Sequence, residues 1–85
     1  MRLRLVYFAA LREHLGRDGE SLTVPAEVRT LADLRHTLAS RDSRWQEALG
    51  PHRLVRAAID QRLASDDEML SDGAEVAFFP PVTGG

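Results

Sequence analysis

The last six residues of the chain hold its most distinctive chemistry. They read Pro80-Pro81-Val82-Thr83-Gly84-Gly85. Proline donates no backbone hydrogen bond to a neighbouring strand and favours an extended conformation. The two terminal glycines have no side chain, so a narrow pocket of another protein could admit them. The sequence therefore predicts a slim C-terminal arm whose reactive group is the α-carboxylate of Gly85.

The rest of the chain does not predict a self-contained active site. The three histidines, His14, His36 and His52, are widely spaced, and cysteine and lysine are absent. The six glycines do not form a phosphate-binding G-x-G-x-x-G pattern, and the sequence has no G-x-S-x-G nucleophile elbow. We therefore expect surface or helix-packing histidines, no bound cofactor and no metal site, with the catalytic groups supplied by partner proteins.

Length, composition and charge narrow the class of protein. The chain has 85 residues, of which 44% are hydrophobic and 28% charged, which is typical of one small globular domain. A formal net charge of −2 argues against nucleic acid as a ligand. No apolar run approaches the roughly 20 residues that span a bilayer, and the N-terminus lacks a signal-peptide pattern. We therefore expect a cytoplasmic protein that does not bind membranes.

Alternating hydrophobic residues predict four strands. The expected ranges are Arg2–Phe8, Glu20–Val24, Val55–Ile59 and Ala74–Phe79. The first two should pair as a hairpin, because Asp18-Gly19 is a turn signal between them. The last strand can lie parallel to the first through a right-handed crossover.

Three helices are expected between these strands. They cover Ala9–Leu15, Thr30–Ser40, and a short segment that opens with Ser43 as N-cap and ends at Gly50-Pro51. In the middle helix, Thr30 and Asp33 have the spacing of a capping box. Leucines at positions 31, 34 and 38 form one apolar stripe along the same helix.

This order of elements predicts an α+β fold of the ubiquitin-like β-grasp type. The hairpin buries a face only if a helix covers it, so a mixed sheet should pack on one main helix. We expect a single domain over residues 1–85, with residues 79–85 protruding as a flexible Gly-Gly tail.

Two phenylalanines fall on the face of the sheet that the alternation assigns to solvent. Phe8 shares that face with Arg4, and Phe79 shares it with Glu75. Exposed together, the two rings would form an apolar patch of the kind that marks a partner interface. Leu63, in the turn after the third strand, is expected to extend the patch. A slip in strand register or a covering loop would remove it.

An acidic segment, Asp66-Asp67-Glu68, precedes Asp72 and Glu75. It is typical of a solvated turn. Alternatively, it could steer a basic partner toward the protein, and the sequence leaves both interpretations open.

Several segments together resemble a known protein family. They are Tyr7-Phe8-Ala9-Ala10-Leu11-Arg12-Glu13, Thr30-Leu31-Ala32-Asp33-Leu34-Arg35, Asp60-Gln61 and the final stretch from Asp72 to Gly85. In order and spacing, over essentially the whole chain, they resemble the small, sulfur-carrying subunits of molybdopterin synthase (the MoaD family). Asp60 is a departure, since relatives often have Asn at this position, and the complete lack of lysine is another.

The resemblance implies a non-catalytic carrier subunit in molybdenum cofactor biosynthesis. An E1-like adenylyltransferase would use ATP to adenylate Gly85, and a cysteine desulfurase or rhodanese-type donor would supply sulfur to form a thiocarboxylate. The arm of Pro80, Pro81, Val82, Thr83 and Gly84 would then deliver this sulfur to cyclic pyranopterin monophosphate in the large subunit.

The resemblance also implies a docking surface and an assembly. Phe8, Leu63 and Phe79 match the family's hydrophobic contacts with the large subunit, and two small and two large subunits would form a heterotetramer. Two alternatives remain: a sulfur carrier for thiamine or nucleoside thiolation, and a ubiquitin-like protein modifier or adaptor.

Overall fold

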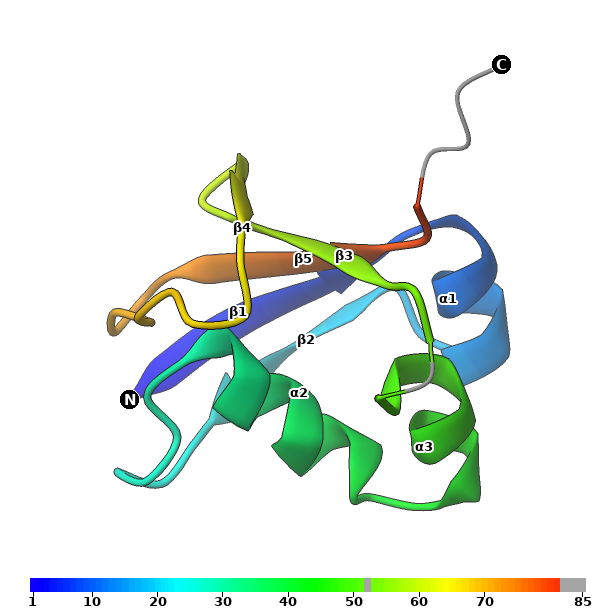
Figure 1. Cartoon of the computed structure of the whole chain (residues 1–85), viewed down its shortest axis with the longest axis horizontal. Coiled ribbons are helices and arrows are strands. Elements are labelled where there is room, and N and C mark those ends of the chain that lie inside the picture. Colours follow the sequence, from blue (N-terminus) through cyan, green and yellow to red (C-terminus); the bar gives the residue numbers. More distant parts are fainter. Residues whose placement is uncertain (52, 82–85) are drawn as a thin grey trace.

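The computed structural model describes residues 1–51 and 53–81, and within them a mixed sheet packs on helices (Figure 1). In chain order the elements are β1 (Arg2–Tyr7), α1 (Ala9–Leu15), β2 (Gly19–Thr23), α2 (Leu31–Ala39), α3 (Ser43–Leu49), β3 (Arg56–Ile59), β4 (Arg62–Ala64) and β5 (Glu75–Phe79). The predicted α+β class is confirmed.

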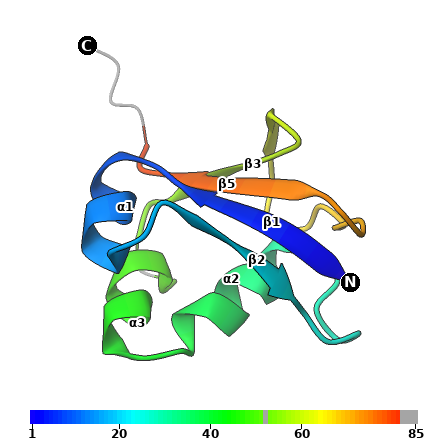
Figure 2. The ribbon, with the colours of Figure 1, turned by 180° about the vertical axis from the view of Figure 1, so that it is seen from behind.

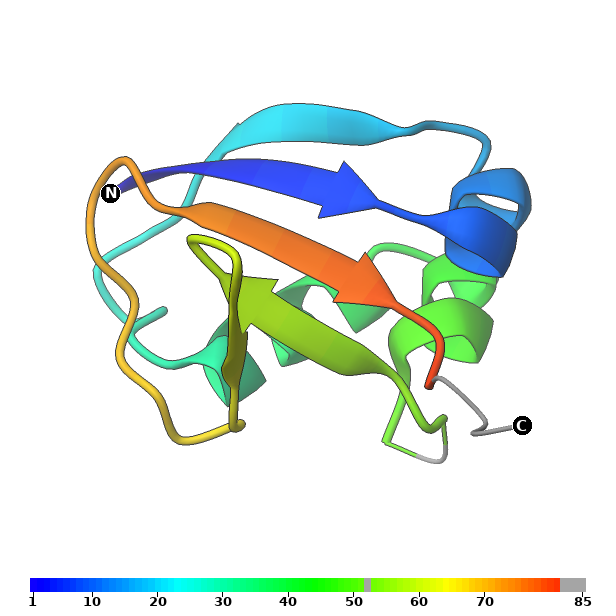
Figure 3. The same cartoon turned by 90° about the horizontal axis from the view of Figure 1, so that it is seen from above.

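The strands lie in the order β2-β1-β5-β3-β4. β1 pairs with β2 in antiparallel register and with β5 in parallel register, as expected. β5 is therefore central, with β1 on one side and β3 antiparallel on the other. Helix α1 lies between β1 and β2, over the predicted range Ala9–Leu15, so these two strands pair across a helical connection. Figure 3 shows the sheet from the side that the helices do not cover.

One face of the sheet forms the core. Leu3, Leu5 and Tyr7 of β1 and Val76 and Phe78 of β5 are almost completely buried, which confirms the predicted alternation. Helices α2 and α3 cover this face, and Figure 2 shows both of them below the sheet from behind. Burial of these apolar side chains is the main favourable contribution to folding.

The helix boundaries follow from side-chain caps. Thr30 and Asp33 form the predicted reciprocal capping box at the start of α2. For α3 the prediction was wrong by one residue: Asp42 is the N-cap, and its carboxylate accepts a hydrogen bond from the backbone N–H of Trp45 at 3.2 Å. Asp42 has an extended backbone, which an N-cap requires, whereas Ser43 is already helical.

A strand was missed after β3. Leu63 lies in β4 and not in a turn, and it faces Ala58 of β3. Asp60 and Gln61 make the two-residue turn, both with positive φ. The strand escaped detection because it is only three residues long and because its turn lacks the glycine that normally signals a tight hairpin.

Candidate functional site: an apolar outer face beside the C-terminal arm

The aromatic residues that were predicted to face solvent lie at the ends of two adjacent parallel strands. Tyr7 pairs with Phe78, so the next residues, Phe8 and Phe79, lie beside each other where the strands end. Phe8 is 49% exposed and Phe79 is half-buried. Phe8 has an extended backbone, which keeps its side chain on the same face as Val6.

A row of small residues continues this apolar surface across the sheet. Val6 lies opposite Ala77, Ala77 opposite Ala58, and Ala58 opposite Leu63. Ala77 is 8% exposed, although its strand face was assigned to solvent, since neighbouring strands flank it on both sides. Leu63 is 65% exposed at the end of the row. We call these four residues with Phe8 and Phe79 the outer apolar patch.

Charged residues border the outer apolar patch on two sides. Arg4 and Glu75 face each other one row away from it. Arg56 lies opposite Phe79 on the side where β5 ends. An apolar centre with a charged rim is the usual anatomy of a protein–protein interface.

The described part of the arm begins at the edge of this patch. The tail was predicted to start at residue 79, but Phe79 is the last residue of β5, so the arm begins with Pro80 and Pro81. Both prolines line a groove of about 490 Å³ together with residues of α1, of α3 and of the segment before β3. The remaining predicted arm residues, Val82, Thr83, Gly84 and Gly85, lie outside the described residues.

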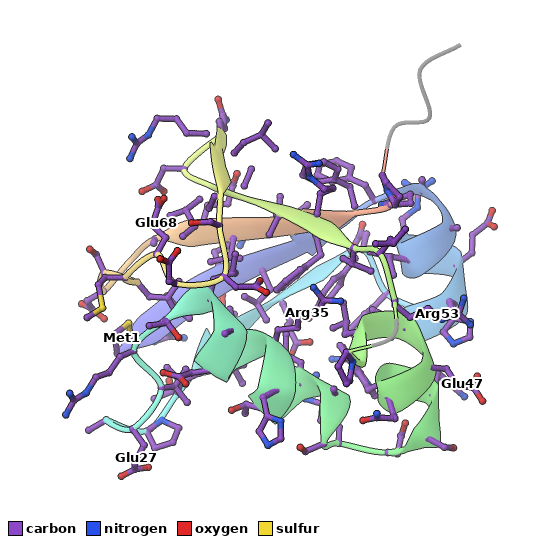
Figure 4. The ribbon with its side chains drawn as sticks, viewed as in Figure 1. Met1, Glu27, Arg35, Glu47, Arg53 and Glu68 are labelled. Atoms are coloured by element: carbon purple, nitrogen blue, oxygen red, sulfur yellow. The ribbon has the colours of Figure 1, made fainter. Side chains whose placement is uncertain are left out.

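Arg35 holds the segment that forms one wall of this groove. From α2 its guanidinium donates hydrogen bonds to four backbone carbonyls, those of Leu49 (2.8 Å), Gly50 (3.2 Å), Arg53 (2.6 Å) and Val55 (3.4 Å). Figure 4 shows Arg35 directed from α2 toward the segment that contains Arg53. One side chain thus anchors the connection from α3 to β3, because its planar fork offers five donors.

A second polar cluster ties β1 and β2 to the helical layer. The hydroxyl of Tyr7 donates to Glu20 at 2.9 Å, and the Arg41 guanidinium binds both carboxylate oxygens of Glu20 at 2.8 and 2.9 Å. Arg41 also stacks on Trp45, 4.4 Å from its ring centre. The hydrogen bonds from Arg41 lower the pKa of Glu20, whereas burial raises the pKa of Tyr7 far above its usual value.

The histidines and the acidic segment were the other sequence candidates. His14 is exposed beside Glu47, with 3.6 Å between Nε2 and a carboxylate oxygen, His36 is exposed on α2, and His52 lies outside the described residues. Within the described ranges, no three histidine or acidic side chains gather as metal ligands.

In the acidic turn, the backbone carbonyls of Asp66 and Glu68 accept hydrogen bonds from the first residues of α2, Ala32 and Leu31. These bonds give acceptors to N–H groups in the first turn of α2 that have no partner within the helix, so the acidic turn helps to cap α2. Steering of a basic partner by its carboxylates stays a prediction.

Sequence reasoning did not single out the alanine row or the membership of Leu63 in a strand. A small residue in the centre of a sheet gives no periodicity signal, and only the pairing register places Ala58 beside Ala77.

None of the helices in residues 1–51 and 53–81 has the length and apolarity to cross a bilayer.

Comparison with known proteins identifies a matching family and similar sequences. Residues 5–85 match the ThiS family. A molybdopterin synthase sulfur carrier subunit from Escherichia coli (strain K12) is 45% identical over 83 residues, covering 98% of this chain and 99% of that protein.

Two solved structures share the fold. One is a chain from the complex of subunits 1 and 2 of molybdopterin-converting factor from Helicobacter pylori 26695, with a TM-score of 0.68, 22% identity and full coverage of both chains. The other is small archaeal modifier protein 1 of Haloferax volcanii, with a TM-score of 0.77 and 21% identity over 95% of this chain and 98% of that one.

The sheet order, the helical layer on one face and these structural neighbours define a ubiquitin-like β-grasp protein. The sequence match is more specific than the fold. The chain belongs to the ThiS family, and within it to the molybdopterin synthase sulfur carrier subunits.

Proposed function

We propose that this chain carries sulfur on Gly85 as a thiocarboxylate and donates it to cyclic pyranopterin monophosphate inside molybdopterin synthase. The observation that carries the proposal is the 45% identity, over nearly the whole chain, to a molybdopterin synthase sulfur carrier subunit. A sulfur-carrier role in molybdenum cofactor biosynthesis follows from membership of that family. The thiocarboxylate, its activation and its acceptor are the proposed chemistry.

Activation is needed because a carboxylate is a poor electrophile. An E1-like adenylyltransferase would join the Gly85 carboxylate to the α-phosphorus of ATP and release pyrophosphate. The terminal sulfur of a donor persulfide would then displace AMP, and a thiol would cleave the S–S bond to leave the thiocarboxylate. The donor would be a cysteine desulfurase or a rhodanese-type protein. Two such carriers would supply the two sulfurs of the dithiolene.

Docking would make the sulfur transfer effectively intramolecular. The outer apolar patch lies beside Pro80 and Pro81, so a protein bound on the patch is well placed to receive the arm. We propose the large synthase subunit as that partner, in a cytoplasmic assembly of two small and two large subunits. The Helicobacter pylori structure, a complex of subunits 1 and 2, supports such a pairing. The catalytic acid–base groups would then belong to the large subunit.

Intact-protein mass spectrometry tests the chemistry directly. The purified chain is incubated with ATP, the adenylyltransferase and a persulfide donor, and the expected product is heavier by one sulfur minus one oxygen. Fragmentation should place this change on Gly85, and a variant that lacks Gly85 should acquire none. Molybdopterin synthesis that continues with an uncleavable residue appended after Gly85 would refute the proposal.

The alternatives predict different products. A carrier for thiamine or nucleoside thiolation would form the same thiocarboxylate but would not restore a molybdoenzyme-deficient strain that lacks its own carrier. A protein modifier would appear in isopeptide bonds to lysines of other proteins. The fold does not separate these functions, since small archaeal modifier protein 1 shares it.

A further inference from the structure

Ala9 has a backbone conformation that is unfavourable for alanine. Its φ is +52°, and it stands at the junction of β1 and α1. In the described ranges, the other non-glycine residues with positive φ are Asp60 and Gln61, which form the β3–β4 turn. A Cβ crowds the backbone when φ is positive, so glycine or asparagine is the usual choice there. Strain of this kind persists when the surrounding structure enforces it, and it gathers at functional sites.

The residue before Ala9 has its backbone fixed on both sides. The N–H of Phe8 donates to the carbonyl of Phe78 in β5 at 3.1 Å. The carbonyl of Phe8 accepts hydrogen bonds from Leu11 at 3.1 Å and Arg12 at 3.4 Å, in the first turn of α1. With the turn at Ala9, Phe8 hydrogen-bonds both to β5 and to the first turn of α1. Phe8 remains 49% exposed.

The hydrogen-bonded backbone of Phe8 therefore holds its aromatic ring close to the point where the C-terminal arm begins. The ring lies on the same face as Val6 and next to Phe79, within the outer apolar patch. A large side chain that must be ordered on binding weakens affinity, whereas one that is held in place beforehand does not. We propose that Ala9 is a positioning residue: its positive-φ turn fixes Phe8 in the orientation that the large subunit binds. This inference rests on the proposed docking of the outer apolar patch.

Substituting glycine for Ala9 tests its effect on folding and its effect on binding separately. Ala9→Gly removes the steric strain, so the melting temperature should not fall. It also frees the backbone next to Phe8. Ordering one loosened side chain on binding corresponds to roughly a threefold to tenfold increase in Kd. The binding partner in the assay is the purified large subunit, and Kd is measured by calorimetry or interferometry.

Three companion variants make the test specific. Ala10→Gly, one residue further along α1, should lower the melting temperature through helix propensity and leave Kd unchanged. Ala9→Asn keeps a side chain in a residue type that tolerates positive φ, so it should retain the wild-type Kd. In a Phe8→Ala background, Ala9→Gly should have no effect on Kd, because it acts through the Phe8 ring.

Two outcomes would overturn the inference. If Ala9→Gly binds like the wild type while Phe8→Ala weakens binding, Ala9 does not position the ring, yet docking through the patch still holds. If Phe8→Ala itself leaves Kd unchanged, both the docking surface and the role of Ala9 fail. Loss of sulfur loading on Gly85, by contrast, would count against the proposed function alone.

Discussion

Asp60 and Glu75 hold each other through two hydrogen bonds. The backbone N–H of Glu75 donates to Oδ1 of Asp60 at 3.0 Å, and the N–H of Asp60 donates to the carbonyl of Glu75 at 2.9 Å. The first residue of the central strand β5 is thereby tied to the turn between β3 and β4. Because that hairpin carries Leu63, the pair fixes one end of the outer apolar patch.

Removing the Asp60 carboxylate should loosen this connection. Asp60→Ala leaves the Glu75 N–H without its side-chain acceptor, so the free energy of unfolding should fall by about 1–2 kcal/mol. Asp60→Asn keeps an Oδ1 acceptor and tolerates the positive φ, so it should unfold like the wild type. Urea titration followed by circular dichroism measures both. An unchanged midpoint for the alanine variant would show that the bond contributes nothing.

Glycine should stabilise the same turn. Gln61 has a φ of +68°, which costs a residue with a Cβ more than it costs glycine. We therefore expect Gln61→Gly to raise the free energy of unfolding by about 0.5–1 kcal/mol. Gln46→Gly, within α3, should lower it by a similar amount. The prediction is wrong if both glycines shift the urea midpoint in the same direction.

Binding to the large subunit should depend on the exposed apolar side chains of the patch. Phe8→Ala, Leu63→Ala and Phe79→Ala should each weaken binding by about 1–4 kcal/mol, as buried interface anchors do. Met69 is 62% exposed outside the patch, so Met69→Ala is the matched control and should bind normally. Calorimetry gives Kd, and circular dichroism checks the fold. Unfolding of the phenylalanine variants would place these rings in the core instead.

Loss of the Arg35 guanidinium should destabilise the protein. Arg35→Met keeps most of the side-chain volume but leaves the carbonyls of residues 49, 50, 53 and 55 without their shared donor. The free energy of unfolding should drop by roughly 2–4 kcal/mol, since hydrogen bonds from a charged group are among the stronger ones. Arg44 is exposed on α3, so Arg44→Met is the control. Equal urea midpoints for the two variants would contradict this anchoring role.

Stability should decrease in acid through Glu20. Its pKa is lowered from an ordinary value of 4.5, chiefly by hydrogen bonds from Arg41. A lowered pKa means that the folded state favours the ionised form, so this stabilisation is complete above pH 4.5 and is lost as the pH falls below it.

The check is a comparison of melting temperatures at pH 7 and at pH 3. Between pH 7 and pH 3, the melting temperature of the wild type should fall further than that of Glu20→Gln, because the glutamine cannot titrate. Asp33, whose pKa is also lowered, remains in both proteins and contributes equally to each. Identical losses in the two proteins would rule out Glu20 as a source of the acid sensitivity.

Sequence patterns between neighbouring residues were sufficient to predict much of the fold. The inner faces of β1 and β5, the leucine stripe of α2 and the Thr30–Asp33 capping box all depend on residues a few positions apart. The exposure of Phe8 followed from the same alternation. Features with weak local signals were missed, namely the three-residue strand β4 and the cap at Asp42.

By itself, the sequence determined the identity of the terminal residues, the alternation of the strands and the family. The tertiary structure decided which residues of different strands meet, because pairing register is set by contacts between distant segments. It placed Val6, Ala77, Ala58 and Leu63 in one row, and it showed the positive φ of Ala9 next to Phe8. Composition and residue spacing do not predict the φ of Ala9. That angle is set when β1, held in the sheet, and α1 both pack in place and the chain between them must join the two.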